Sequence, residues 1–180
     1  MPKGVMHSIR NFANATYNLN YDIHLVKHPR FFSYLPLSHI AERIGIENQA
    51  FLLGASMTFA DTLDSFASDL EATQPDLFFA VPRIWAKFQE KIREGLPQKK
   101  LNVLLKVPLL GKVLKNKIRQ KLGLSKAKYI VSGAAPLSVD LMNWFKTLDI
   151  EILQGYGMTE DCVISHLNLP TVNKIGSVGR

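Results

Sequence analysis

The sequence predicts an α/β protein with a largely parallel sheet and helices on both of its faces. Short apolar runs of strand length alternate with longer segments of helical periodicity along the whole chain. This alternation is typical of a parallel sheet, because each return to the same sheet edge needs a crossover helix. Apolar residues make up 47% of the chain, which fits a soluble globular protein rather than a disordered one.

The first half of the chain contains three expected strands with helices around them. The expected order is a helix over 7–20, a strand over 31–35, a helix from 39 towards 53, a strand over 55–59, a helix over 63–72 and a strand over 77–81. Ser38 is expected to cap the second helix, and Asp61 or Thr62 the third, because short polar side chains accept hydrogen bonds from first-turn amides. The pair Gln74-Pro75 should end the third helix.

The second half adds two strands and a basic helical segment. Pro82 can open the next helix, and Pro108 and Gly111 are expected to break the stretch 99–128 into two helical pieces. A strand is expected over 129–131, a helix over 139–148 and a last strand over 150–153.

The formal charge of +7 is concentrated in one segment. Residues 83–128 hold 14 Lys and Arg against two Glu, whereas the rest of the chain has a net charge of −5. This distribution argues against a protein that coats nucleic acid, as does the lack of aromatic residues between Gln89 and Lys128. The basic segment could lie on an anionic membrane or form a solvated helical insertion that covers the core. The second interpretation is favoured, because lysine-rich exposed helices are common.

Several protein classes do not fit the sequence. No apolar run approaches the ~18–20 residues that a membrane-spanning helix needs. The first residues lack the apolar run of a signal peptide, and the lone Cys162 excludes an internal disulfide, so we expect a cytoplasmic location. His24 and His28 are spaced for zinc on one helical face, but no third ligand accompanies them, which disfavours a metal site there.

Polar or glycine-rich segments follow three of the expected strands, at 37–39, 132–136 and 154–160. Ligands of open α/β sheets bind at the carboxyl ends of the strands, so these loops are expected to converge on one pocket.

The segment 154–160 carries groups suited to a nucleotide. Gly155 and Gly157 permit a sharp turn and close approach of a ligand, and Tyr156 offers a flat face for a purine. Thr159 could bond a phosphate oxygen, and the carboxylate of Glu160 suits Mg²⁺. From these residues alone, an ordinary surface turn with a core tyrosine is equally acceptable.

Two further segments are weaker signals. Gly133, Ala134 and Ala135 have small side chains against which a flat ligand could lie, yet a plain strand-to-helix connection explains them better. Lys3, between Pro2 and Gly4, is similar to the end of a phosphate-binding loop, although a terminal lysine is usually just solvated.

Five ordered motifs resemble those of the adenylate-forming superfamily, which includes acyl-CoA synthetases, luciferases and peptide-synthetase adenylation domains. They are the segments 1–6, 35–39, 131–137, 156–160 and 176–179. The resemblance spans the whole chain and is closest to long-chain fatty acid–CoA ligases, through residues 34–43 and 81–85.

The resemblance implies ATP-dependent activation of a fatty acid, with Mg²⁺ and with coenzyme A as acceptor. It makes Thr159 and Glu160 catalytic and Glu160 the Mg²⁺ ligand. It implies an acyl pocket at His39, Gln154 and Gly155, although Arg43 stands where some long-chain relatives have an aromatic gate. The nucleotide-binding residues that it implies are Lys3, Gly133, Ala134, Ala135, Gly155, Tyr156, Gly157 and Thr159.

The same resemblance implies that residues 1–180 are a central fragment of the large amino-terminal domain, with a basic helical insertion over about 83–128. The glycine-rich half of the phosphate loop and the small carboxyl-terminal domain would then lie outside it, and the isolated fragment would be inactive. Two alternatives remain open: acyl-AMP formation for a carrier protein, and a non-catalytic module that binds lipid or nucleotide.

Overall fold

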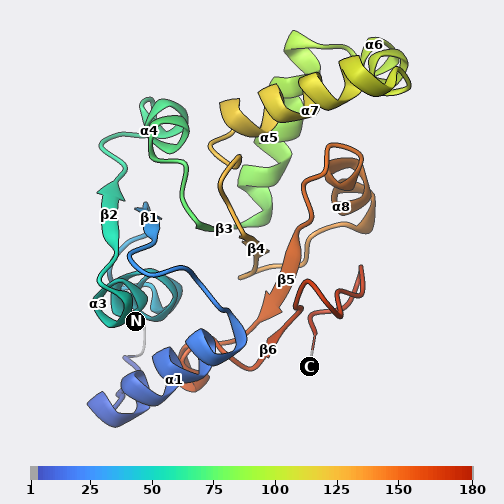
Figure 1. The fold of residues 1–180 in the computed structure, drawn as a ribbon. Coiled ribbons are helices and arrows are strands. Elements are labelled where there is room, and N and C mark those ends of the chain that lie inside the picture. Colours follow the sequence, from blue (N-terminus) through green and yellow to red (C-terminus); the bar gives the residue numbers. More distant parts are fainter. Residues whose placement is uncertain (1–3, 180) are drawn as a thin grey trace.

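The computed structural model describes residues 4–179 and contains a six-stranded sheet in the order β2-β1-β3-β4-β5-β6 (Figure 1). Neighbouring strands from β1 to β5 are parallel, and β6 pairs antiparallel with β5. The predicted α/β fold is therefore confirmed. The strands are β1 (Arg30–Ser33), β2 (Ser56–Phe59), β3 (Leu77–Ala80), β4 (Tyr129–Ser132), β5 (Leu153–Tyr156) and β6 (His166–Leu167).

Helices connect the strands and cover the sheet. They are α1 (Ile9–Asp22), α2 (Ile40–Glu42), α3 (Gln49–Leu53), α4 (Phe66–Thr73), α5 (Pro82–Gly95), α6 (Gln98–Leu105), α7 (Pro108–Lys121) and α8 (Val139–Lys146). A π-helical stretch, η1 (Arg43–Asn48), joins α2 to α3, and a 3₁₀ turn, η2 (Thr159–Asp161), follows β5. No helix within residues 4–179 is long and apolar enough to cross a membrane.

Successive residues of the strands face opposite sides of the sheet, as the two-residue repeat of a strand requires. Phe31 packs with Leu19 and Ile23 of the α1 side, whereas Phe32 packs with Leu70 on the α4 side. Helices therefore cover both faces, as the sequence predicts.

The larger core lies on the face covered by α4, α5, α7 and α8. At its centre Trp85 is fully buried and donates its indole N–H to the carbonyl of Ala80 at 3.1 Å. Its ring meets Phe78 and Phe145 edge to face, with centroids 5.7 and 5.4 Å apart. Because the polar indole nitrogen has a partner, this packing stabilises the junction of β3, α5 and α8 without an unpaired donor.

The helix caps in the first half differ from the predicted ones. His39, not Ser38, caps α2, because its Nδ1 accepts the backbone N–H of Ala41 at 3.2 Å. The next helix begins at Phe66 with Ser65 at the cap position, since the preceding residues form a turn in which the Thr62 amide donates to the Ser65 hydroxyl. Several short polar residues compete for each cap, and tertiary packing decides between them.

Two elements in the second half also differ. The last parallel strand is β5, three residues later than the predicted 150–153, because pairing with β4 begins at Leu153. Ile150 is instead buried in the core that packs on α8. Gly111 does not break the basic segment: it lies inside α7, where an added Cβ would meet the carbonyl of Leu105 at 3.0 Å, so glycine lets α6 and α7 pack closely.

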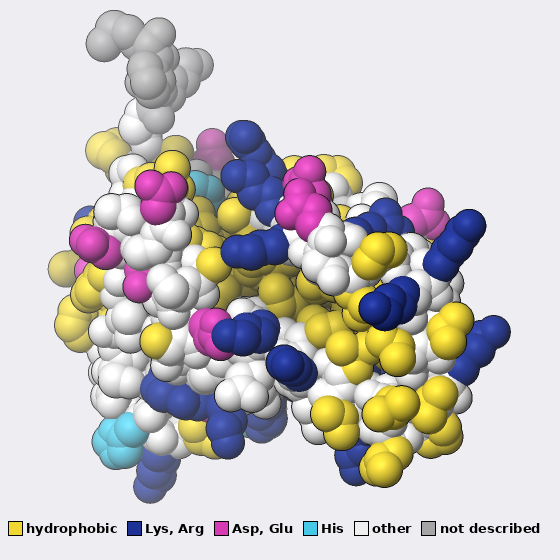
Figure 2. Space-filling view, turned by 90° about the horizontal axis from the view of Figure 1, so that it is seen from above, with side chains coloured by type: hydrophobic (Ala, Val, Ile, Leu, Met, Phe, Trp, Pro, Cys, Tyr) yellow, Lys and Arg dark blue, Asp and Glu magenta, His cyan; other side chains and the backbone are white. Residues whose placement is uncertain are grey.

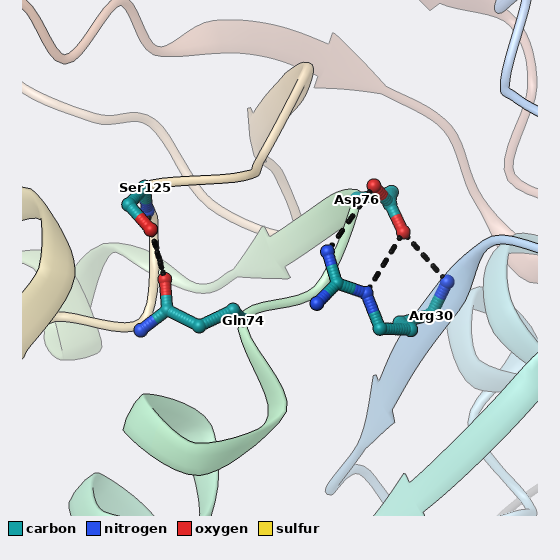
Figure 3. A network of polar contacts seen from close by, with 4 residues as sticks. All are labelled: Arg30, Gln74, Asp76 and Ser125. Carbon is teal, nitrogen blue, oxygen red and sulfur yellow. Dashed lines mark hydrogen bonds and ion pairs between the residues drawn. The ribbon is translucent and has the colours of Figure 1, made fainter.

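Polar side chains join the elements where the strands begin (Figure 3). Asp76, just before β3, accepts the backbone N–H of Arg30 at 2.8 Å and its guanidinium Nε at 3.3 Å. Gln74, at the end of α4, accepts the hydroxyl and the amide of Ser125. These bonds fix the amino ends of β1, β3 and β4 to one another.

Candidate active site

An open, mainly apolar pocket lies between the sheet and the helices α1 and η1. At the carboxyl ends of β4 and β5 it is lined by Gly133, Ala134 and Tyr156. It also touches Leu77, at the start of β3, which pairs with Tyr129 of β4. From that pair to Gly133 the strands advance four residues, or about 13 Å. The pocket is therefore long in the strand direction and joins a glycine-rich end to an apolar one.

At the glycine-rich end the chain is tightly packed. A Cβ on Gly133 would lie 3.0 Å from the ring of Phe79 and 3.3 Å from the carbonyl of Gly155, so a side chain would push β4 and β5 apart. Ala134 follows with a left-handed φ of 65°, which is unusual for a residue with a Cβ and costs conformational energy. Ala134 is exposed, so a ligand could lie against its backbone.

Tyr156 ends β5 with its side chain half exposed, at 48%. Its ring lies 6.0 Å from the imidazole of His166 on β6, tilted by 58°. The two rings form one wall of the pocket and can provide the flat face predicted for Tyr156. The sequence did not point to His166, because a strand of two residues leaves no periodic signal.

The loop after Tyr156 is closed by backbone contacts rather than by a turn at the glycines. Gly155 lies within β5, and neither it nor Gly157 takes a left-handed φ, which corrects the predicted sharp turn. An added Cβ on Gly157 would lie 2.4 Å from the carbonyl carbon and oxygen of Val163. The left-handed residues are instead Cys162 and Val163, with φ of 59° and 67°. Since Val163 is β-branched, this conformation is strained, as at many binding sites.

Asp161 holds the loop in this shape. Its carboxylate accepts the backbone N–H groups of Met158 and Val163, both at 2.9 Å, and the hydroxyl of Ser165. Desolvation raises the pKa of Asp161, but the hydrogen bonds outweigh it and hold this pKa below its usual value. The sequence gives no sign of this role, because only the geometry of the loop distinguishes Asp161 from the neighbouring Glu160.

Thr159 and Glu160 lie on η2 with exposed side chains. The carbonyl of Thr159 lies 2.6 Å from Nε2 of His7, which ties the start of the chain to this loop. Glu160 lines a shallow depression beside α1 with Asn14 and Asn18, not the long pocket. The structure thus brings Gly133, Ala134, Gly155, Tyr156 and Gly157 to one pocket, with Thr159 and Glu160 beyond its rim.

The carboxylate of Glu160 fits a magnesium ion held mainly by phosphates and water. No hydrogen bond or ion pair within residues 4–179 engages it, so it is available to a hard cation. The same residues contain no group of three or more His, Cys, Asp and Glu that could hold a metal alone. Mg²⁺ commonly binds in this way, through one or two carboxylates and the phosphates of a nucleotide.

A comparison with protein families matches residues 1–180 to the model described as AMP-binding enzyme. The chain belongs to this family. The rat long-chain-fatty-acid–CoA ligase ACSBG2 is 30% identical over 211 aligned positions, which cover 99% of this AMP-binding chain and 32% of the rat protein. The chain thus spans about a third of the length of that relative, in agreement with the predicted fragment.

Two solved structures share the fold of this AMP-binding chain. The amino-terminal domain of FACL13 from Mycobacterium tuberculosis superposes with a TM-score of 0.70 at 24% identity, over 99% of the chain and 40% of that domain. The adenylation domain of the Segniliparus rugosus carboxylic acid reductase gives 0.66 at 26% identity, over 88% of the chain and 26% of that protein. That domain holds AMP and a co-purified carboxylic acid.

For two residues of the AMP-binding chain, His39 and Gln154, the acyl-pocket role stays a prediction. His39 caps α2, and Gln154 is buried in β5; neither lines the long pocket, whereas Gly155 does. The helical segment after His39 contributes Ala41 and Gly45 instead. These small residues are four apart, so they share one helical face and leave room before the sheet.

Glu42 joins this helical segment to the chain that follows β1. It is buried, and its Oε2 accepts the backbone N–H of Leu35 at 3.3 Å, which ties the end of β1 to α2. Burial raises the pKa of Glu42 above its usual value. Arg43, which stands at the gate position of some relatives, forms a surface ion pair with Glu47 at 2.7 Å and is not one of the residues that line the pocket.

The remaining predicted residues are peripheral or outside the described part. Ala135 is exposed and does not line the pocket, and Lys3 lies outside residues 4–179. The motif at 176–179 packs on β6: Gly176 and Gly179 take left-handed φ values of 84° and 89°. The buried Asn168 donates its side-chain N–H to the carbonyl of Ser177 at 2.6 Å, which fixes the motif in place.

Proposed function

We propose that this chain contributes the adenine and acyl sides of the active site of an ATP-dependent fatty acid–CoA ligase. The observation that carries the proposal is the single long pocket, which joins a glycine-rich end beside Tyr156 to an apolar end at Leu19, Ile23 and Leu77. An acyl-adenylate has the same division, with a flat polar nucleotide joined to an apolar chain. The family match and the names of the relatives support this substrate class.

The reaction proceeds in two displacements. An oxygen of the fatty acid carboxylate attacks the α-phosphorus of ATP, and pyrophosphate leaves. The thiol of coenzyme A then attacks the acyl carbon of the mixed anhydride, and AMP leaves with the bonding electrons. Both steps depend on alignment and charge neutralisation, and neither needs a covalent bond to the protein.

In this proposal Tyr156 stacks on adenine while the backbone of Gly133 and Ala134 supports its other side. The Thr159 hydroxyl donates to an α-phosphate oxygen, and Glu160 holds the magnesium ion. When bound, Mg²⁺ neutralises the charge that develops between the phosphates. The small residues Ala41 and Gly45 leave space for the acyl chain between the helix and the sheet.

A pocket-filling substitution tests the acyl side directly. A Cβ on Gly45 would meet nothing within 4 Å, so Gly45→Leu places its side chain in the pocket without a backbone clash. We expect this variant to lose about tenfold or more in affinity for a stable dodecanoyl-adenylate analogue and to bind AMP unchanged. Gly95→Leu is the matched control, because Gly95 also has open space around it and lies outside the pocket. Equal affinity of both variants for the analogue would refute the proposed acyl pocket.

Activity tests the reaction itself. We expect the isolated 180-residue polypeptide to bind the adenylate analogue but to catalyse no ATP–pyrophosphate exchange, because it spans about a third of its relatives. The complete reading frame should catalyse fatty-acid-dependent exchange and release acyl-CoA. Acyl-AMP formation without transfer to coenzyme A would favour a carrier-protein acceptor, and no exchange with any fatty acid would favour a non-catalytic module.

A further inference from the structure

We propose that the turn between α6 and α7 is a docking surface for an anionic lipid bilayer, a function beyond the proposed ligase activity. Five apolar side chains at this turn form an exposed group, here called the apolar tip. They are Val103, Val107, Leu109, Leu110 and Val113, which are 64, 42, 76, 54 and 60% exposed. Single exposed apolar residues are ordinary, but five within eleven positions form a patch of the kind that marks an interaction site.

The apolar tip is distinct from the face of the helices that packs on the core. In the same segment Leu101 is fully buried and Ile118 is buried, both in the main core. Leu105, Leu114 and Leu122 are partly buried against it. The helices have therefore already satisfied their core contacts, and the tip residues are apolar without being needed for packing.

Side-chain hydrogen bonds tie the helix pair to the body of the protein. Gln98, at the start of α6, accepts the indole N–H of Trp144 at 2.7 Å and the Nε–H of Arg93 at 3.1 Å. Gly111 lets α7 approach the end of α6 closely. Figure 1 shows α6 at the margin of the molecule, away from the sheet. A fixed protrusion of this kind can contact a flat surface without reorganising the fold.

The segment that carries the apolar tip has only basic charged residues. No Asp or Glu occurs between Glu94 and Asp140, whereas this stretch contains ten Lys and Arg. Lys115 and Lys121 pair with Asp149 and Glu71. Five further exposed lysines of α6, α7 and the turn between them form no ion pair within residues 4–179: Lys99, Lys100, Lys106, Lys112 and Lys117. Figure 2 shows apolar side chains gathered on one side of this face with basic side chains beside them.

An anionic bilayer matches both features at once. Its headgroup layer attracts lysines, each contributing about a fivefold gain in binding near a negative surface, and its acyl boundary accepts apolar side chains. A single-stranded nucleic acid would use the charge but not the valines and leucines, and the segment has no aromatic residue on which bases could stack. The structure thus favours lipid over the solvated insertion that the sequence alone suggested, because it exposes Leu109, Leu110 and Val113.

Vesicle flotation tests the proposal. We expect the 180-residue chain to float with vesicles of phosphatidylcholine and phosphatidylserine, to remain unbound with phosphatidylcholine alone, and to dissociate as salt is raised. The triple variant Leu109→Ser/Leu110→Ser/Val113→Ser removes the apolar contacts and should lower binding about tenfold or more. Lys106→Glu/Lys112→Glu reverses two charges and should lower it by at least about 25-fold. Since all five residues are exposed, both variants should fold, and their circular dichroism should match that of the parent chain.

Matched controls lie outside α5–α7. Leu63→Ser replaces an apolar residue that is 95% exposed, and Lys27→Glu/Lys174→Glu reverses two exposed charges. We expect both controls to bind anionic vesicles within about twofold of the parent chain.

Three results would overturn the proposal. The first is absence of flotation with anionic vesicles, either by the chain or by its complete reading frame, in which other segments could cover the tip. The second is an equal loss of binding in the controls. The third is a different occupant: a change of oligomeric mass in the triple variant would indicate a second copy, and retention of single-stranded RNA that survives the triple substitution would indicate nucleic acid.

Discussion

The two ends of the parallel strands use their polar side chains in opposite ways. At the amino ends, Asp76 is engaged by both the backbone and the guanidinium of Arg30, and Gln74 by Ser125. Lys128, just before β4, likewise donates to the carbonyl of His24 at 2.6 Å. These groups bond to one another and to the backbone, so they stabilise the fold and are not free to bind a ligand.

At the carboxyl ends two of the predicted site residues keep accessible polar groups. Tyr156 is half exposed, and the carboxylate of Glu160 has no protein partner within residues 4–179. Ala134 and Val163 have left-handed φ values there, but so do His28 and Gln74 at the amino ends, so backbone strain does not distinguish the two ends. Accessible polar groups that do not serve stability are typical of a binding edge. Substitutions at the two edges should therefore separate stability from ligand binding.

The largest effect should come from Gly157→Ala, which displaces the backbone of the loop at the carboxyl end of β5. The new Cβ would lie 2.4 Å from the backbone of Val163, so the loop must move. We expect the free energy of unfolding to fall by about 1–3 kcal/mol. Binding of the adenylate analogue, measured by titration calorimetry, should fall below detection.

Gly95→Ala is the control for that change. It lies at the end of α5 with nothing within 4 Å of the new Cβ, so it should leave ligand binding unchanged and stability equal or slightly higher. Normal ligand affinity in Gly157→Ala would show that the loop is not part of the site.

A substitution at the amino ends of the strands should lower stability without changing ligand affinity. Asp76→Ala leaves the backbone N–H of Arg30 without its acceptor, so we expect a loss of about 1–2 kcal/mol in the free energy of unfolding by urea. The affinity for the adenylate analogue should not change at temperatures where the variant remains folded. If Asp76→Ala lost as much ligand affinity as Gly157→Ala, the two ends of the strands would not differ in their roles.

The sequence predicted this distinction only in outline. Strand–helix alternation gives a parallel sheet, and a parallel sheet places the glycine-rich segments at one edge, so the fold and the location of Gly133 and Tyr156 followed from periodicity and order. The roles of His166 and Asp161 did not follow. They depend on a two-residue strand and on a loop closed by its own backbone, and neither leaves a pattern in the sequence.

The caps show the same limit. Ser38 and His39 can both accept an amide N–H, and only the observed hydrogen bond from Ala41 selects the histidine. The start of β5 depends on where pairing with β4 begins, which is a tertiary property that local apolar content does not encode.

A smaller effect is expected for Glu42→Gln, which tests the buried carboxyl bonded to the chain just after β1. Desolvation raises the folded pKa of Glu42 above 4.5, so the native state keeps this proton while the unfolded chain loses it. The parent chain therefore loses stability as the pH rises from about 4.5 through the folded pKa. Glutamine has no such ionisation, and the Leu35 amide can still donate to its side-chain oxygen.

We accordingly expect the stability of Glu42→Gln, relative to the parent chain, to increase as the pH is raised through that window. Urea unfolding at a series of pH values measures it, with Glu90→Gln at an exposed position as the control for loss of one charge. Parallel stability curves for the parent and Glu42→Gln would show that burial does not perturb this carboxyl.

The smallest effect on folding should come from Glu160→Gln. Because its carboxylate bonds to no other group within residues 4–179, we expect the free energy of unfolding to change by less than about 0.5 kcal/mol. If Glu160 holds magnesium, the gain in ATP affinity that Mg²⁺ gives the parent chain should be lost, while AMP binding without metal should persist. Asp161→Asn separates this role from loop structure, because it weakens the bonds to Met158 and Val163 and should lower both stability and AMP binding. If Mg²⁺ raises the ATP affinity of Glu160→Gln as much as that of the parent chain, Glu160 does not bind the metal. The carboxyl ends of the strands would then bind the nucleotide without a metal ligand from η2.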